Sequence, residues 1–158
     1  KAMAEVVKKY PNVELLIVGD GAERKKLENE ALKLGVKNNV KFLGWQNNPE
    51  EFYSQADAFL LTSDYEGWGM AVVEAAGCGL PIIMTDVGCA GELIENEKSG
   101  LVIPVNDQAK LEEAMIRFIG DENLRKNLAE GALSAIKNLP NKEETMFLYK
   151  ESWEKAIE

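Results

Sequence analysis

Residues 58–84 read AFLLTSDYEGWGMAVVEAAGCGLPIIM, and this stretch decides the fold. A short apolar run at 58–61 is followed by a polar loop, by a helix expected to begin near Gly69, and by a second apolar run at 81–84. Nearly continuous apolar runs of this length are typical of strands that are buried on both faces. The succession of strand, helix and strand therefore predicts two parallel strands joined by a crossover helix.

The same alternation continues on both sides of this stretch. Three further strand-like runs lie at residues 13–18, 40–43 and 101–103, and helical patterns separate most of them. The last third of the chain has helical spacing of apolar residues, with a break at Gly120-Asp121. We therefore predict an α/β fold built on a Rossmann-like, doubly wound parallel sheet.

The beginning of the chain does not fit a complete doubly wound unit. Four apolar side chains between Met3 and Tyr10 have helical spacing, whereas such a unit begins with a strand in the middle of its sheet. Two arrangements satisfy this pattern. Either the strands at 13–18 and 57–61 pair directly, or the first, central strand is missing, and the second arrangement is our prediction.

The end of the chain predicts a helix that begins with a capping box. Asn141 and Glu144 have the spacing at which each side chain can bond the other residue's backbone N–H. Apolar side chains then recur along one side of this helix, and we expect them to pack in the core or in an interface. They are Met146, Tyr149, Trp153 and Ile157.

Composition excludes several classes of function. The 158 residues suit one domain with its own core, and they include no histidine, so no Ser-His-Asp triad, histidine zinc site or imidazole base exists within them. The net charge of −9 makes a nucleic-acid partner unexpected. Cys78 and Cys89 form no CxxC motif, which favours a reducing, cytoplasmic location.

The loops that follow the predicted strands locate the candidate site, because in a parallel sheet they all lie at one edge. The Gly19-Asp20-Gly21 turn stands between a strand and a helix, as a dinucleotide-binding turn does, but Arg24 occupies the position of the third glycine. A nicotinamide site is therefore disfavoured. Two interpretations stay open, namely a turn that brings the backbone close to a ligand, and a purely structural turn.

The loop before Gly69 carries two informative carboxylates. Glu66 stands just outside the expected helix, and Glu74 lies about one turn inside it. The amides of Gly69, Met70 and Ala71 would carry partial positive charge that can hold a diphosphate. Because an unpaired carboxylate beside a phosphate would be repelled, we expect Glu66 and Glu74 to accept hydrogen bonds from hydroxyl groups on either side of it.

In this context the two glutamates resemble the Glu-x7-Glu signature of the GT-B glycosyltransferases, specifically the large retaining family of group 1 hexosyltransferases. The resemblance covers roughly residues 13–107 and follows one order along the chain. Its further members are residues 15–21 with Leu27, residues 40–44, Ala56-Asp57, Gly79-Leu80-Pro81, Thr85-Asp86-Val87-Gly88, Glu92 and residues 100–104.

The resemblance implies that residues 1–158 form the C-terminal, donor-binding domain of a two-domain enzyme whose N-terminal domain is its partner. The donor would be a nucleoside diphosphate (NDP) sugar, and the hexosyl group would pass with retention to a glycan, lipid or small acceptor. By position, Glu66 is the catalytic residue that lies against the transferred sugar, and Glu74 binds the ribose hydroxyls. The remaining donor-binding residues would be Gly67, Trp68, Gly69, Met70 and Ala71 at the sugar and phosphates, Gly44 and Trp45 at the base, and Gly19 and Gly21 in the first turn.

No metal ion is expected at this site, since the sequence lacks the Asp-x-Asp motif of the other major glycosyltransferase fold. In the family, an Arg and a Lys on the loop after the first strand hold the diphosphate, and that segment would precede Lys1. Arg24 and Lys25 are interpreted as ordinary surface side chains. We therefore expect these residues alone to be inactive.

Two other classes of protein fit the same residues. One is a sugar-nucleotide epimerase or a phosphorylase-like GT-B enzyme, although an epimerase would be expected to need histidines in the cleft. The other is a non-catalytic nucleotide-binding module. The resemblance also implies a cytoplasmic enzyme, with attachment of the full-length protein to the inner face of the membrane left open.

Overall fold

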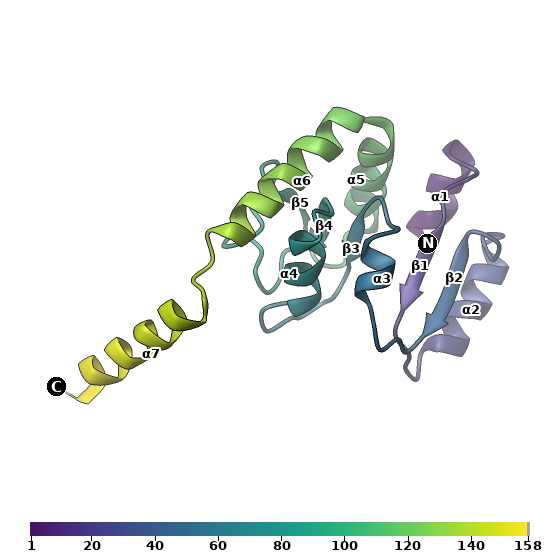
Figure 1. Ribbon diagram of the computed structural model, residues 1–158. Coiled ribbons are helices and arrows are strands. Elements are labelled where there is room, and N and C mark those ends of the chain that lie inside the picture. The colour runs from purple at the N-terminus through teal and green to yellow at the C-terminus, as the bar shows by residue number, and fades with distance from the viewer. Residues whose placement is uncertain (158) are drawn as a thin grey trace.

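The computed structural model describes residues 1–157, in which short parallel strands alternate with helices (Figure 1). The strands are β1 (Leu15–Val18), β2 (Val40–Gly44), β3 (Phe59–Leu61), β4 (Ile82–Thr85) and β5 (Gly100–Ile103). The helices are α1 (Ala2–Lys9), α2 (Arg24–Lys33), α3 (Glu50–Tyr53), α4 (Met70–Gly77), α5 (Gln108–Gly120), α6 (Glu122–Lys137) and α7 (Lys142–Ile157). All five predicted strands are confirmed, as is the helix that follows Gly69.

The strands form two separate sheets. One contains β1 and β2, the other has the order β3-β4-β5, and every pairing is parallel. Direct pairing of the strands at 13–18 and 57–61, one of the two arrangements left open by the sequence, is therefore wrong. Each of β1 and β3 has a strand neighbour on one side only among the described residues.

Burial of the strands follows from this topology. β4 is buried along its whole length and β5 nearly so, as expected for strands between two layers of helices. β1, β2 and β3 are only partly buried, so burial on both faces is a wrong prediction for these three strands. The physical reason is the cover by helices, because α5 and α6 both pack on β5, whereas α2 is the main helix on β2 and α4 the main helix on β3.

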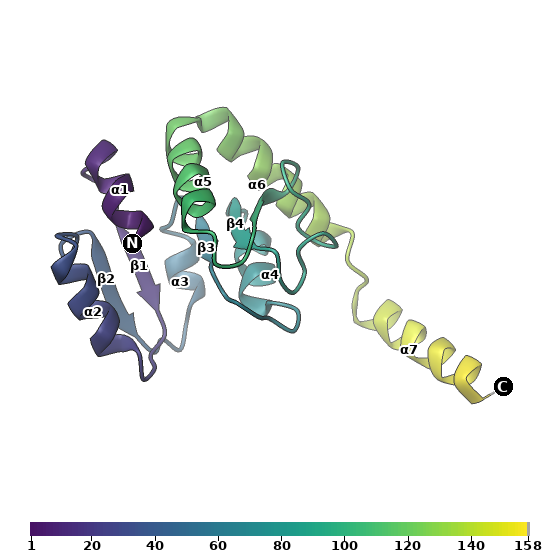
Figure 2. The same ribbon diagram turned by 180° about the vertical axis from the view of Figure 1, so that it is seen from behind.

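Side chains of β4 alternate between two hydrophobic clusters, one on each face of the sheet. Ile83 packs with α1, α5 and Leu101, whereas Ile82 and Met84 pack with α4 and α6. This alternation is the period of two that a strand imposes on its side chains. Helices therefore cover both faces of the β3-β4-β5 sheet, as in a doubly wound fold (Figure 2).

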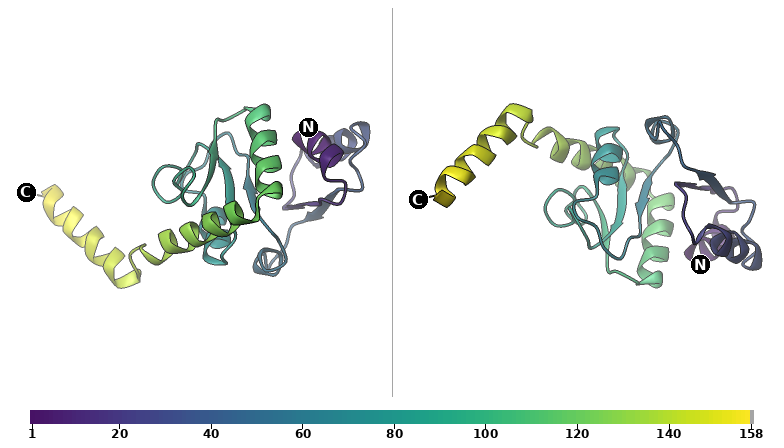
Figure 3. Two further views of the ribbon diagram at one scale, coloured as in Figure 1. Left: turned by 90° about the horizontal axis from the view of Figure 1, so that it is seen from above. Right: turned by 90° about the horizontal axis from the view of Figure 1, so that it is seen from below.

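Helix α7 projects away from the other elements in every view (Figures 1, 2 and 3). Its predicted capping box is confirmed, since the Glu144 N–H donates to Asn141 Oδ1 at 3.0 Å and the Asn141 N–H donates to Glu144 Oε2 at 2.9 Å. None of its residues is buried, so a place for its apolar side chains in the core is a wrong prediction. The exposed apolar residues are Met146, Phe147, Leu148, Tyr149, Trp153 and Ile157.

Across residues 1–157, none of the helices combines the length and the apolar character that a membrane span requires.

Candidate functional site

The loops that follow β1, β2 and β3 lie along one edge of the molecule, at the lower side of Figure 1. The turn after β1 and the end of β2 are in direct contact, because the Gly19 N–H donates to the Gly44 carbonyl at 2.8 Å. Both glycines have positive φ, +121° at Gly19 and +70° at Gly44, a region that side chains disfavour. The structure thus brings these two predicted site residues together.

The other members of this part of the site are accessible. Gly21 is exposed, and its N–H donates to Asp20 Oδ1 at 2.8 Å, which closes the turn after β1. Trp45 directly follows β2, and its side chain is 78% exposed. An indole with this exposure presents a flat apolar surface for a ring to stack on.

The turn between β3 and α4 has the conformation that the sequence predicted. Gly69 is the residue before the helix and has left-handed backbone angles of φ 88° and ψ 59°. Within residues 1–157, the N–H groups of Gly69, Met70 and Ala71 have no hydrogen-bond partner, as expected for the first residues of a helix. These three donors are therefore unpaired within the described domain, at a turn where Met70 is exposed, Ala71 is half-buried and Gly69 is buried.

Glu66 is held in place by a hydrogen bond from Ser63, and Ser63 is in turn held by Thr85. Ser63 Oγ donates to Glu66 Oε1 at 2.7 Å, and Thr85 Oγ1 at the end of β4 donates to the Ser63 carbonyl at 2.7 Å. Thr85 is almost fully buried, at 4% exposure, so this support is anchored in the core. The second carboxylate oxygen, Oε2, has no hydrogen-bond partner in the described part of the chain, and it can accept from a ligand.

The loop after β4 presses against the backbone beside Glu66. Gly88 has a φ of +57°, and a Cβ there would lie 2.7 Å from the Trp68 carbonyl oxygen and 3.0 Å from Glu66 Cβ. The next residue, Cys89, donates its N–H to the same Trp68 carbonyl at 2.9 Å. Only glycine permits this close approach, so the loops after β3 and β4 form one packed unit.

Glu74 also has a partner from another element. It lies on the exposed side of α4, and Tyr53 of α3 donates its hydroxyl to Glu74 Oε2 at 3.2 Å. The Tyr53 ring packs edge-on against Phe59, with 5.8 Å between ring centroids. Burial, together with the hydrogen bond to Glu74, raises the pKa of Tyr53 to about 12. Tyr53 therefore stays a hydrogen-bond donor throughout the neutral range.

The remaining predicted residues between the two glutamates lie at different depths. Gly67 and Met70 are exposed, whereas Ala71 is half-buried. Trp68 is 37% exposed and lines a shallow depression of about 510 Å³ beside α6, together with Leu93 and Ser99. The contribution of these residues to ligand binding stays a prediction, because their positions alone do not define a contact.

Three supporting residues had no role assigned to them from the sequence. Ser63 precedes Glu66 by three residues, a spacing at which a serine hydroxyl can form a local hydrogen bond. This spacing was the one sequence signal that could have indicated the contact with Glu66. Thr85 and Tyr53 come from β4 and α3, far from their partners along the chain, and no periodicity indicates such contacts. Among residues 1–157, no group of three or more Cys, Asp and Glu side chains is placed to hold a metal ion.

Comparison with known proteins shows the family of the chain. Residues 1–135 match the family model described as glycosyl transferases group 1. The chain belongs to the group 1 glycosyltransferase family. Over 136 residues the chain is 33% identical to the N-acetyl-alpha-D-glucosaminyl L-malate synthase of Bacillus anthracis, and the match covers 86% of the chain and 35% of the relative.

Solved structures share the fold of this chain. Sucrose-phosphate synthase from Thermosynechococcus elongatus has a TM-score of 0.83 at 25% identity, over 99% of this chain and 41% of the other. Anabaena HepE, solved in complex with UDP and glucose, has a TM-score of 0.78 at 28% identity, over 85% of this chain and 38% of the other. The predicted Rossmann-like fold of a GT-B C-terminal domain is therefore confirmed.

The chain spans between 35% and 40% of the length of the first four curated relatives that it matches.

Proposed function

We propose that residues 1–158 are the C-terminal donor-binding domain of a retaining glycosyltransferase that transfers a hexosyl group from an NDP-sugar to a glycan, lipid or small acceptor. The observation that carries this proposal is the β3–α4 turn. Three unpaired backbone N–H groups at the start of α4 follow Glu66 and precede Glu74 along the chain. The complex of HepE with UDP and glucose supports a nucleotide sugar as the ligand.

Each part of the turn suits one part of such a donor. The N–H groups of Gly69, Met70 and Ala71 donate to the diphosphate, whose charge also interacts favourably with the α4 dipole. Glu74 accepts from the ribose hydroxyls, with Tyr53 holding one of its oxygens. Glu66 accepts from a hydroxyl of the transferred sugar and orients it, because Ser63 occupies one carboxylate oxygen and leaves the other free.

The end of β2 completes the donor site on the side of the base. In this proposal the backbone of residues 42–45 borders the base, with Gly44 and Trp45 in contact with it. Gly19 and Gly21 shape the adjoining turn after β1, which hydrogen-bonds to Gly44. The β1–β2 side of the site thus serves the nucleoside, while the β3–α4 side serves the phosphates and the sugar.

Transfer with retention follows from a front-face displacement. The bond between the sugar C1 and the leaving phosphate oxygen breaks, and a bond from C1 to the acceptor oxygen forms on the same face. The acceptor proton passes to the leaving phosphate, so no protein base is needed, in keeping with a chain without histidine. Glu66 supports the developing charge on the sugar rather than forming a covalent bond.

The rest of the enzyme supplies what these residues lack. The proposed N-terminal domain provides the acceptor site, and a segment before Lys1 provides cationic side chains for the diphosphate in place of a metal ion. Residues 1–158 alone are therefore inactive and bind UDP or GDP sugars only weakly in this proposal. The full-length enzyme works in the cytoplasm.

Two substitutions in the full-length enzyme test these roles. We expect Glu66→Ala to lower kcat by about 100-fold with little change in donor KM, because charge support is lost at the transition state. We expect Glu74→Gln to raise the donor KM by about tenfold, because it weakens hydrogen bonds to the bound nucleoside. Glu130→Gln, on the exposed side of α6, is the matched control and leaves both constants unchanged.

Steady-state kinetics with a panel of UDP and GDP sugars provide the measurement. Wild-type rates for both Glu66→Ala and Glu74→Gln would contradict the assignment. Binding of nucleotide sugars without any transfer by the full-length protein would instead favour a non-catalytic module. Calorimetry on residues 1–158 adds a separate check, because tight micromolar binding there would show that the cationic segment matters less than proposed.

A further inference from the structure

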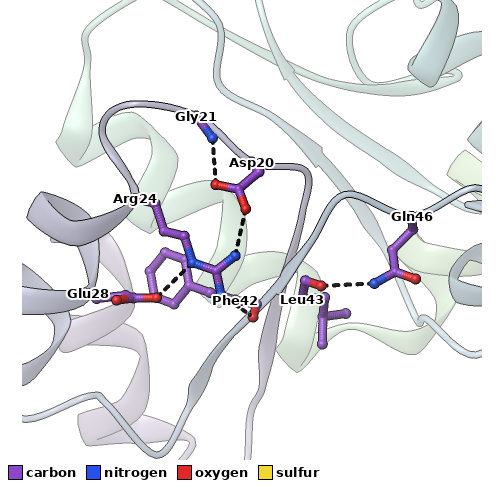
Figure 4. Close-up of polar contacts among 7 residues, drawn as sticks. All are labelled: Asp20, Gly21, Arg24, Glu28, Phe42, Leu43 and Gln46. Carbon is purple, nitrogen blue, oxygen red and sulfur yellow. Dashed lines mark hydrogen bonds and ion pairs between the residues drawn. The ribbon is translucent and has the colours of Figure 1, made fainter.

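Arg24 at the start of α2 contacts the turn after β1, its own helix and the more distant strand β2 (Figure 4). Its Nη1 donates to Asp20 Oδ2 at 2.9 Å, and its Nε donates to Glu28 Oε1 at 2.9 Å. Its Nη2 donates to the Phe42 carbonyl in β2 at 3.1 Å. The planar guanidinium presents donors in these directions at the same time, which a lysine ammonium cannot match.

The surroundings of Arg24 do not favour a ligand phosphate. Two carboxylates already share its charge, and the hydrogen bonds to Glu28 and then to Asp20 raise the pKa of Arg24. Together these three residues carry one net negative charge, which would repel a phosphate. A third of the Arg24 side chain is exposed, at 33%. Three of its five N–H donors are thus bound by the protein itself, so Arg24 lies at the surface as expected but has specific partners there, unlike an ordinary surface side chain.

The end of β2 is irregular at the point that Arg24 contacts. Ile17 pairs with Phe42 and Val18 pairs with Gly44, so Leu43 is left out of the register. Such an irregularity disrupts the ladder locally and redirects the strand. Side chains take the place of ladder contacts here, with Arg24 at the Phe42 carbonyl and Gln46 Nε2 donating to the Leu43 carbonyl at 2.8 Å.

The Arg24 guanidinium lies so close to the backbone of Gly44 that it leaves little room for a side chain there. A Cβ at Gly44 would lie 3.1 Å from Arg24 Nη1 and 3.6 Å from Asp20 Oδ2. The Gly44 backbone has a φ of +70° and bonds the turn after β1 through its carbonyl. Arg24, Asp20 and the end of β2 therefore form one rigid corner from which the exposed Trp45 projects.

We propose that Arg24 is a positioning residue for the nucleoside of the donor, acting through the backbone of residues 42–45. This rests on the proposed function, in which that backbone borders the base. Arg24 does not touch the donor. It holds the irregular end of β2 in the one conformation that presents Gly44 and Trp45 to the base, and the two carboxylates hold Arg24.

The test measures inhibition constants of three probes on the full-length enzyme, namely UDP, GDP and inorganic pyrophosphate. In Arg24→Met the inhibition constant of the preferred nucleotide rises about tenfold, because the base loses its positioned backbone. The constant for pyrophosphate, which lacks a base, stays at the wild-type value. Arg24→Lys gives an intermediate loss, and Lys25→Met, an exposed neighbour with the same charge, gives none.

Hydrogen exchange gives a second readout in residues 1–158. The amides of Leu43 and Gly44 exchange faster in Arg24→Met than in wild type, while those of β4 keep their protection. Unchanged nucleotide constants in Arg24→Met and Arg24→Lys would overturn the inference. An equal loss for pyrophosphate would overturn it as well, since a general structural defect or a phosphate contact would then explain the effect.

The same experiment separates this inference from the proposed function. If no nucleoside diphosphate, with ADP and dTDP tested beside UDP and GDP, inhibits the wild-type enzyme, the proposed function is wrong, and the role of Arg24 in donor binding falls with it. If wild type binds a nucleotide and Arg24→Met binds it equally well, the proposed function stands and only the role of Arg24 is refuted.

Discussion

Gly88→Ala tests how tightly the loop that carries Glu66 is held. The φ of +57° at Gly88 costs an alanine about 1 to 2 kcal/mol. The new Cβ would also lie 2.7 Å from the Trp68 carbonyl oxygen and 3.0 Å from Glu66 Cβ. Because the Trp68 carbonyl is held by the amide of the buried Cys89, it cannot simply move aside, and overpacking of this kind costs about 1 to 3 kcal/mol more.

Gly79→Ala is a control that separates these two costs. Gly79 also has positive φ, at +79°, but a Cβ there has no atom within 4 Å. Its substitution should therefore lower the free energy of unfolding by about 1 to 2 kcal/mol through backbone strain alone. Gly88→Ala should lower it by about 3 kcal/mol, the sum of strain and contact.

Urea denaturation followed by circular dichroism measures both values by linear extrapolation. Hydrogen exchange at Cys89 then shows whether the bond to Trp68 has opened. A loss in Gly88→Ala that matches the loss in Gly79→Ala would refute the reasoning, because the loops after β3 and β4 would then not be in rigid contact. The inference that the loop after β4 supports Glu66 would then also be refuted.

Two further predictions concern stability. Burial and the hydrogen bond to Glu74 raise the pKa of Tyr53 to about 12, whereas the unfolded state has a pKa near the ordinary 10.0. The folded state therefore holds the phenolic proton more tightly than the unfolded state. This contribution to stability is complete below pH 10 and is lost as pH rises toward 12. Urea titrations across this range should show a steeper fall for wild type than for Tyr53→Phe, and parallel curves would contradict the assigned cause. Ending the chain at Leu139 removes α7, which has no buried residue. This truncation should change the free energy of unfolding by no more than about 0.5 kcal/mol. A loss of several times that value would show that α7 packs on the domain.

Local patterns predicted the elements well. The five apolar runs all form strands, α4 begins directly after Gly69, and Asn141 with Glu144 caps α7 as expected. These features depend on interactions within a few residues, such as backbone sterics at glycine and the periodicity of apolar side chains. The edge of the sheet that gathers the candidate site also followed from sequence, because parallel strands place their carboxyl ends together.

Contacts between distant elements could not be predicted in the same way. Arg24 looked like a surface side chain because its partner in β2 is the carbonyl of Phe42, and a backbone group has no sequence signature. Tyr53 likewise reaches Glu74 only because α3 and α4 pack side by side. The apolar side of α7 predicted packing, yet periodicity cannot tell a core partner from an exposed face, and the structure leaves this helix exposed.

The sequence by itself determined the α/β fold, the order of its elements and the two carboxylates beside a helix start, since each is written in local composition and spacing. Only the tertiary structure decided that the sheet is interrupted between β1 and β3. It also decided that Ser63, Tyr53 and Arg24 hold the candidate site in shape. The reason is physical, because strand pairing and side-chain partners depend on how whole elements pack in space, which no short-range pattern specifies.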